Sequence, residues 1–182
     1  IYTFEQQDAQ KIIALSNGGF VVCWVSHYQD EAEIFGQVFD GDGHKIGYEI
    51  QINTDTKGSQ RQPAIAALDS GRFIVFWKSY ELFAETNGVY GQVFNEAGEK
   101  VGLEFKVGSS RVETPVSQTL SNGSNIVCWA GWSDGWDVFA KMYFAEPLIH
   151  QLNPFEIIDP GNDATLETAA PVFNWHQPDS IH

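Results

Sequence analysis

The sequence has 182 residues, of which 43% are hydrophobic and 14% aromatic, and its formal net charge is −14. The apolar content excludes a disordered chain, and the acidic balance disfavours nucleic acid as a partner, because affinity for phosphate backbones comes largely from Lys and Arg. No stretch of about 18 apolar residues is present, so we expect no membrane insertion.

Three segments share one pattern, in which a polar turn with glycine precedes an apolar strand that ends in tryptophan. The segments are 14–24, 67–77 and 119–129. Their tryptophans, Trp24, Trp77 and Trp129, repeat every 53 or 52 residues. A period of this length is typical of modular repeat folds. We therefore expect three repeats, at about 8–57, 58–108 and 109–145, with the three tryptophans as structural core anchors.

Each repeat is expected to form four strands joined by turns that contain glycine. In the first repeat the expected strands are 12–15, 20–24, 34–39 and 48–52. The strand 20–24 is apolar on both faces, so it should be covered on both sides. The strand 48–52 alternates apolar and polar residues, as a half-exposed outer strand does. This organisation predicts an all-β fold of consecutive four-stranded antiparallel blade-like repeats, a β-propeller or partial propeller.

The third repeat is eroded in its second half. Gly43 and Gly47 of the first repeat are matched by Gly98 and Gly102, whereas the corresponding part of the third repeat has no such glycines. A terminal repeat is often atypical because it lacks one neighbour. Since propellers typically have about 4–8 blades, we expect a protein partner or self-association to complete the array, for example a dimer with six repeats.

The repeat motif is Leu-x-x-Gly-Gly-Phe-Val-Val-x-Trp followed by Gly-Gln-x-Phe-Asp-x-x-Gly-x-x-x-Gly. It stands at 15–24 and 36–47, and in a closely related form at 68–77 and 91–102. This motif resembles the tandem repeats of very large secreted bacterial proteins, among them adhesin-like and calcium-binding exoproteins. The resemblance covers about residues 8–145. It implies a β-propeller-like array and an extracellular or cell-surface location, and it names no substrate.

Residues 146–182 break the repeat pattern and are expected to form a linker and an irregular C-terminal tail. Pro171, Phe173 and Trp175 in this tail resemble the first strand of fibronectin-type or other immunoglobulin-like modules. The alternative is that the tail packs on the repeats as an extra strand. We also expect the chain to be a piece of a larger polypeptide.

The turn Asp40-Gly41-Asp42-Gly43 resembles a calcium-binding loop. One hypothesis is that Asp40 and Asp42 bind Ca²⁺. The other is an ordinary hairpin turn. Asn95-Glu96-Ala97-Gly98 stands at the same place in the second repeat and keeps only the turn glycine, which favours the turn. No other cofactor is expected.

Aromatic and acidic residues gather in the loops between the two hairpins of each repeat. The candidate ligand-binding residues are Trp132, Asp134, Trp136, Asp137, Tyr28 and Tyr80. Aromatic faces stack on sugar rings and carboxylates accept hydrogen bonds from hydroxyls, so this composition suits a glycan. The alternative is a set of solvated loops whose aromatics cover the ends of the strands.

The sequence carries no motif of a nucleophilic or phosphate-binding site. Glycoside hydrolysis needs two carboxyl groups about 5–10 Å apart, and no carboxylate pair recurs between the repeats. We therefore predict no catalytic residues and no enzymatic activity. The expected function is a structural or adhesive module of a secreted or cell-surface protein. The alternatives are a carbohydrate-binding lectin and, more weakly, a propeller glycosidase.

Overall fold

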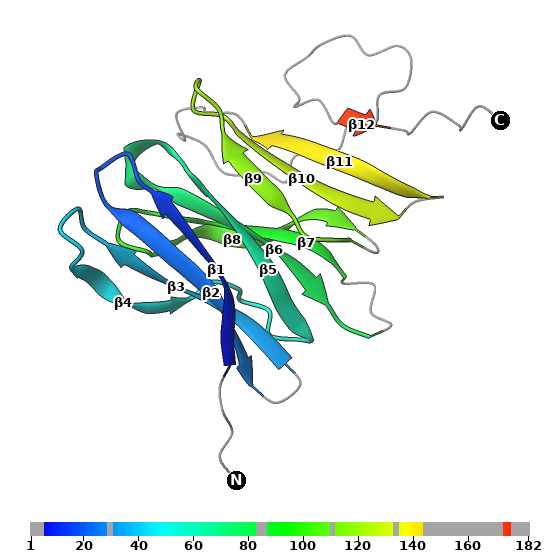
Figure 1. Cartoon of the computed structure of the whole chain (residues 1–182), viewed down its shortest axis with the longest axis horizontal. Coiled ribbons are helices and arrows are strands. Elements are labelled where there is room, and N and C mark those ends of the chain that lie inside the picture. The colour runs from blue at the N-terminus through cyan, green and yellow to red at the C-terminus, as the bar shows by residue number, and fades with distance from the viewer. Residues whose placement is uncertain are drawn as a thin grey trace.

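The computed structural model describes residues 6–28, 31–82, 87–109, 112–132 and 135–143, together with the backbone of 173–175. Within these residues the chain is all-β apart from one 3₁₀ turn, as predicted (Figure 1). The first repeat forms β1 (Gln6–Ala14), β2 (Phe20–Tyr28), β3 (Glu31–Phe39) and β4 (Lys45–Gln51). The second forms β5 (Ser59–Ala67), the 3₁₀ turn Asp69–Gly71, β6 (Phe73–Tyr80), β7 (Gly88–Phe94) and β8 (Lys100–Ser109). The third forms β9 (Val116–Thr119), β10 (Asn125–Trp132) and β11 (Trp136–Tyr143), followed by β12 (Phe173–Trp175).

The strands of the first two repeats pair as two antiparallel meanders, β1 to β4 and β5 to β8. A parallel pair between Ala32 of β3 and Ser59 of β5 joins them into one mixed eight-stranded sheet. The expectation of separate four-stranded blades is therefore only partly met. The cause lies in the connection after β4, where the Ile34 amide donates to Asn53 Oδ1 at 2.9 Å and holds the chain beside β3. That placement brings the start of β5 against β3.

The third repeat forms a second sheet, in the order β12-β11-β10-β9. β12 pairs antiparallel with β11 and so takes the place that β4 and β8 hold beside β3 and β7. The immunoglobulin-like interpretation of the tail rests on Pro171, Phe173 and Trp175, whose side chains lie outside the described residues, as do all of residues 146–172 and 176–182.

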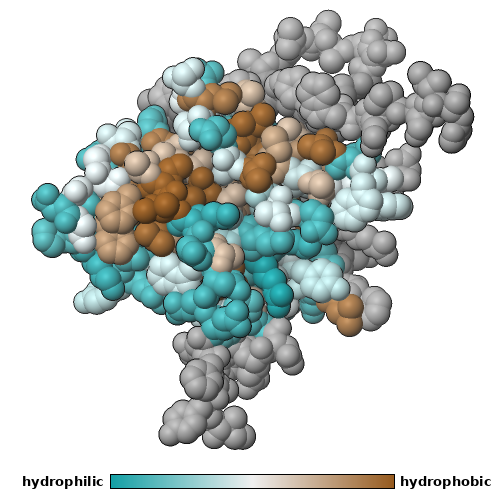
Figure 2. Space-filling view, in the orientation of Figure 1, coloured by the Kyte–Doolittle hydropathy of each residue, from teal (hydrophilic) through white to brown (hydrophobic). Residues whose placement is uncertain are grey.

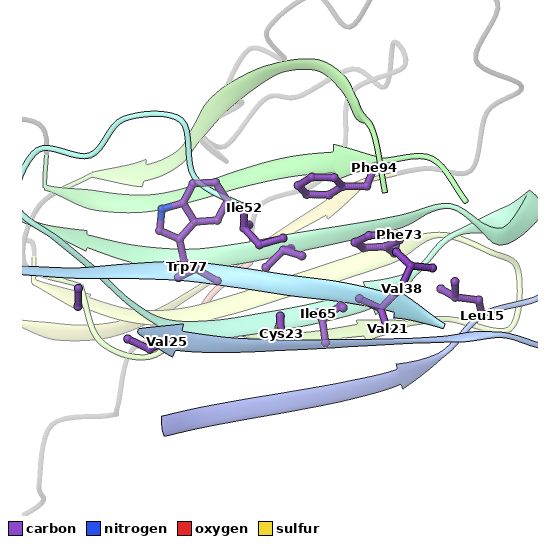
Figure 3. Close-up of a cluster of buried hydrophobic side chains, with 13 residues drawn as sticks. Leu15, Val21, Cys23, Val25, Val38, Ile52, Ile65, Phe73, Trp77 and Phe94 are labelled. Atoms are coloured by element: carbon purple, nitrogen blue, oxygen red, sulfur yellow. The ribbon is translucent and has the colours of Figure 1, made fainter. Parts of the chain in front are cut away.

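The main hydrophobic core lies between the first and second repeats. Its members from the first repeat include Val21, Cys23 and Ile34, and those from the second include Phe73 and Trp77, all with 0% exposure. Figure 3 shows such side chains gathered between the strands of the two repeats. A second cluster lies between the second and third repeats. The apolar strand β6 thus presents one face to the first repeat and the other to the third.

The three repeat tryptophans differ in burial. Trp77 is fully buried and Trp129 is 7% exposed, in line with their expected role as core anchors. Trp24 is only half-buried, because no other repeat packs on its face of β2 among the described residues. Within the described residues there is no helix long and apolar enough to cross a membrane.

Candidate functional site

Three charged residues occupy one equivalent position in the three repeats. Asp8 lies opposite Val25 in the β1–β2 pair, and Arg61 lies opposite Lys78 in the β5–β6 pair. The Glu113 amide donates to the Ala130 carbonyl at 2.8 Å, which gives Glu113 the same register against β10. Because β1 contacts β5 and β5 contacts β9, Asp8 and Arg61 lie at the same end of neighbouring strands, and Glu113 lies in the segment that leads into β9.

The backbone is irregular directly after the first two of these positions. Ala9 has a φ of 53° and Gln62 a φ of 56°, and the pairing register of β1 and β5 shifts there. A residue other than glycine rarely adopts such values, and bulges of this kind re-aim side chains next to functional sites. The same distortion in two repeats singles out this end of the inner strands.

A hollow of about 560 Å³ lies at this end. Its lining comes from β1, β2, β5 and β6 and consists of Asp8, Ala9, Val25, His27, Ser59, Arg61, Gln62, Lys78 and Tyr80. The volume falls within the range of small-molecule sites, roughly 300–1,000 Å³. Most of the lining side chains can donate or accept hydrogen bonds, so the hollow suits a polar ligand.

The polar side chains around the hollow are arranged in pairs. His27 Nε2 lies 3.2 Å from Asp8 Oδ1, and Lys78 Nζ lies 3.5 Å from Glu113 Oε2. Glu113 therefore reaches the hollow through Lys78. The guanidinium of Arg61 donates only to Ser59 Oγ, at 3.5 Å, among the described residues. This end of the strands combines two carboxylates from different repeats with donors that lie between them.

Among the predicted ligand-binding residues whose side chains the structure describes, Tyr80 alone lines the hollow, and it is 48% exposed. It stands three residues after Trp77, as His27 does after Trp24 and Trp132 does after Trp129. Equivalent positions of the first two repeats thus both contribute to the lining. The side chain of Tyr28, and all of Asp134, lie outside the described residues.

Trp132 and Trp136 form a separate aromatic pair where β10 turns into β11. Their ring centroids lie 5.9 Å apart at an interplanar angle of 85°, and the side chains are 42% and 54% exposed. Asp137 follows in β11, opposite Gly131. None of these three residues is part of the lining of the hollow.

Asp40 organises the turn between β3 and β4. Its Oδ1 accepts hydrogen bonds from the amides of Asp42 and His44, at 3.0 and 2.8 Å, and the bond from the His44 amide is the main reason why its pKa is lowered. Asn95 Oδ1 accepts the equivalent bonds from Ala97 and Glu99. Ligand atoms of Asp40, Asp42 and His44 lie within 4.8 Å of one another and could hold a cation. The hydrogen bonds of the turn are by themselves a sufficient reason for an acceptor side chain at position 40.

Two further carboxylates hold the connection between the first and second repeats. Glu33 accepts a hydrogen bond from Asn53 Nδ2, and Glu104 accepts one from the Thr54 amide at 2.6 Å. Burial raises the pKa of both carboxyl groups. Lys100 Nζ donates to Thr54 Oγ1 at 2.8 Å. These contacts give Glu33 and Glu104 a structural role at the junction.

Sequence reasoning did not identify Asp8, Arg61, Glu113 or His27 as site residues. The signal was present, because positions 8, 61 and 113 have the same 53 and 52 residue spacing as the tryptophans. Their chemical types differ, so a search for a conserved residue type between the repeats passes over them.

No model of a known protein family matches the chain, and no curated protein matches it. Among solved structures, an endo-arabinase from Bacteroides thetaiotaomicron VPI-5482 is similar over 79% of this chain, at a TM-score of 0.51 and 13% identity. A thermostable family-43 glycoside hydrolase is similar over 91% of this chain, at a TM-score of 0.53 and 12% identity. Both have a β-propeller fold. This chain spans 58% and 64% of their lengths.

These neighbours contradict the prediction of a non-enzymatic structural or adhesive module. They are glycoside hydrolases, and they favour the weakest alternative of the sequence analysis, a propeller glycosidase. They also give no support to the likeness to adhesin-like exoproteins. The prediction was wrong because turn glycines and core tryptophans encode the scaffold, which is the same for a binding module and for an enzyme.

Proposed function

We propose that the chain supplies three blade-like repeats of a β-propeller that binds a carbohydrate and hydrolyses its glycosidic bonds. The observation that carries this proposal is that Asp8 and Arg61, from one equivalent position of the first two repeats, line the hollow, and that Glu113, from the same position of the third repeat, is paired with the lining residue Lys78. The fold shared with two glycoside hydrolases supports it.

Asp8 and Glu113 are the proposed catalytic carboxylates. In glycoside hydrolysis one carboxyl group protonates the leaving oxygen while the anomeric C–O bond breaks. A water oxygen forms the new bond to the anomeric carbon, and its proton passes to the second carboxylate. Asp8 lines the hollow from β1, and Glu113 lies in the segment before β9 and is paired with Lys78 of the lining, so the proposal places a bound sugar between the two carboxyl groups. His27 holds Asp8, and Lys78 holds Glu113.

The remaining lining residues are proposed to bind the sugar. The exposed ring of Tyr80 offers an apolar face for sugar CH groups, as aromatic residues do in ligand sites. Arg61 and Lys78 present donors to hydroxyl oxygens, and the carboxamide of Gln62 can both donate and accept. An extracellular or cell-surface location belongs to the same proposal, because polysaccharides are met there.

A second candidate is carbohydrate binding without hydrolysis. The exposed, edge-to-face pair of Trp132 and Trp136 favours it, since two rings at a right angle can contact two sides of a sugar.

The release of reducing ends from arabinan and a panel of other polysaccharides tests the first candidate. We expect hydrolysis by the wild type and a loss of about 100-fold or more in Asp8→Asn and Glu113→Gln, as for removal of an acid or base group. Asp42→Asn, at an exposed turn away from the hollow, is the matched control. Binding without hydrolysis that depends on Trp136 would support the second candidate. If the wild type neither binds nor hydrolyses any of the polysaccharides, both candidate functions are rejected.

A further inference from the structure

The first and second repeats carry the same apolar surface on the side that faces a preceding repeat. In the second repeat this surface consists of Ile65, Phe73, Val75, Trp77 and Phe94, and in the first of Ile12, Phe20, Val22, Trp24 and Phe39. We call it the leading face. The internal geometry is the same in both, because Phe73 and Phe94 stack at 5.0 Å and Phe20 and Phe39 at 4.8 Å.

The two leading faces differ in what covers them. In the second repeat Phe73, Val75, Trp77 and Phe94 are fully buried against the first repeat, and Ile65 is 8% exposed. In the first repeat the equivalent aromatic residues are only half-buried, and Ile12 is 68% exposed. Figure 2 shows apolar residues gathered on the face of the molecule where β1 and β2 lie in Figure 1. Among the described residues, nothing therefore covers the leading face of the first repeat as the first repeat covers that of the second.

A polar atom on this face also lacks its partner. Trp77 Nε1 donates to Gln60 Oε1 at 3.0 Å, inside the contact between the first and second repeats. Trp24 Nε1 is shielded from solvent and has no hydrogen-bond acceptor in the described part of the chain. Gln7, the equivalent of Gln60, is exposed in β1. An indole without an acceptor is costly, so this position favours a neighbour that orders the Gln7 side chain.

The opposite surface, which we call the trailing face, is open on the third repeat. In the first repeat its members Val21, Cys23 and Ile34 are fully buried by the second repeat. The equivalent residues of the third repeat, by strand pairing, are Ile126, Cys128 and Val138. Cys128 is half-buried and Val138 is 46% exposed. The chemistry of the two trailing faces is the same, down to the cysteine.

We propose that the leading face of the first repeat docks on the trailing face of the third repeat in a second copy of this chain. The two open faces are the two halves of a contact that the chain already makes between its own repeats. They lie on different repeats, so the association is head-to-tail, which gives a closed ring or an open filament. Two copies would bring together six repeats, within the usual range of about 4–8 blades.

Each copy carries a formal net charge of −14, which opposes association at low ionic strength. We therefore expect the dimer to be favoured by salt, because screening weakens the repulsion while the contact itself is apolar. The direction of this salt dependence distinguishes the proposed apolar contact from a contact between opposite charges, which salt would weaken.

Sedimentation equilibrium and light scattering of the chain, at low and high salt and over a wide range of concentration, test the proposal. We expect a dimer that Ile12→Lys and Val138→Lys each abolish, with unchanged circular dichroism. Leu103→Lys is the matched control, because Leu103 is 88% exposed on β8 and belongs to neither face. A mixture of the two variants should form dimers again, since one intact leading face and one intact trailing face remain. A monomer under all conditions, or a dimer that survives Ile12→Lys, would overturn the proposal.

Discussion

The indole nitrogen of Trp77 donates a 3.0 Å hydrogen bond to the side-chain oxygen of Gln60, within the contact between the first two repeats. Gln60 in turn donates to the Lys57 carbonyl at 2.9 Å. The side chains of Trp77 and Gln60 are both almost fully buried. The pair fixes the inner strand β5 against the apolar strand β6 at the level where the repeats meet. Trp24 and Gln7 have no such bond among the described contacts.

Gln60→Ala should destabilise the fold. It leaves the buried Trp77 Nε1 without an acceptor, which costs about 1–3 kcal/mol of unfolding free energy. Gln7→Ala is the control at the equivalent position of the first repeat, and at concentrations where the chain is a monomer its effect should stay within about 0.5 kcal/mol because Gln7 is exposed. Urea denaturation of the three proteins measures both values. Equal losses of unfolding free energy in the two variants would contradict the role of Gln60 as the buried acceptor for Trp77.

Much of the repeat could be predicted because it is encoded locally. The turn glycines Gly43 and Gly98 have φ values of 85° and 82°, as the hairpin pattern indicates. The inner strands were harder, because the bulges at Ala9 and Gln62 interrupt the two-residue alternation that marks a strand. The sequence pattern therefore starts the first inner strand at residue 12, whereas β1 begins at Gln6.

The pairing of strands that are distant in the sequence was even harder to predict. The parallel pair between Ala32 and Ser59 depends on how Asn53 holds the connection beside β3, and no local pattern announces it. The candidate site shares this property. Asp8, Arg61 and Glu113 belong together only once the strands are aligned in register, since an acid, a base and an acid show no common residue type.

Ala9→Gly and Ala14→Gly should change the stability of β1 in opposite directions. Ala9 has a φ of 53°, in the left-handed region that costs an L-residue roughly 1 kcal/mol, so glycine relieves strain there. Ala14, at the exposed end of the same strand, has no positive φ, and glycine should cost about 0.5–1 kcal/mol through lost chain entropy. Thermal and urea unfolding measure the two signs. Destabilisation by both substitutions would show that the bulge at Ala9 carries no strain.

The junction between the first two repeats should respond to pH through Glu33. Burial raises the pKa of this carboxyl group above the ordinary value of 4.5, so the folded state holds its proton to higher pH than the unfolded state does. The contribution of Glu33 to stability is therefore full below the unfolded pKa and is lost as pH rises through the folded pKa. Glu33→Gln keeps an acceptor for Asn53 and removes the titration.

The measurement is the unfolding free energy of wild type minus that of Glu33→Gln between about pH 4 and pH 8. The difference should shift against the wild type as pH rises above the ordinary Glu pKa. A shift in favour of the wild type over the same range would mean that hydrogen bonding outweighs burial at this carboxyl group.

The turn at Asp40 predicts how the chain responds to calcium. Asp40→Asn should leave the melting temperature nearly unchanged, because Asn95 accepts the same two amide bonds in the second repeat, and Asp40→Ala should lower it. Since the turn already uses Asp40 as an acceptor, we expect Ca²⁺ and EDTA to leave the wild-type melting temperature unchanged. A rise with Ca²⁺ that Asp42→Asn removes would instead establish the cation site.

The aromatic pair of Trp132 and Trp136 predicts a second place where sugars bind. Stacking on an exposed indole contributes through its large apolar area, so Trp136→Ala should weaken binding to a glycan array or to immobilised polysaccharide. Folding should be preserved, because Trp136 is 54% exposed. Tyr80→Ala, in the hollow, should act on hydrolysis as well as on binding, whereas Trp136→Ala should leave the cleavage of a small chromogenic glycoside unchanged. If both variants reduce that cleavage equally, the pair and the hollow form one site, and a bound sugar extends from one to the other.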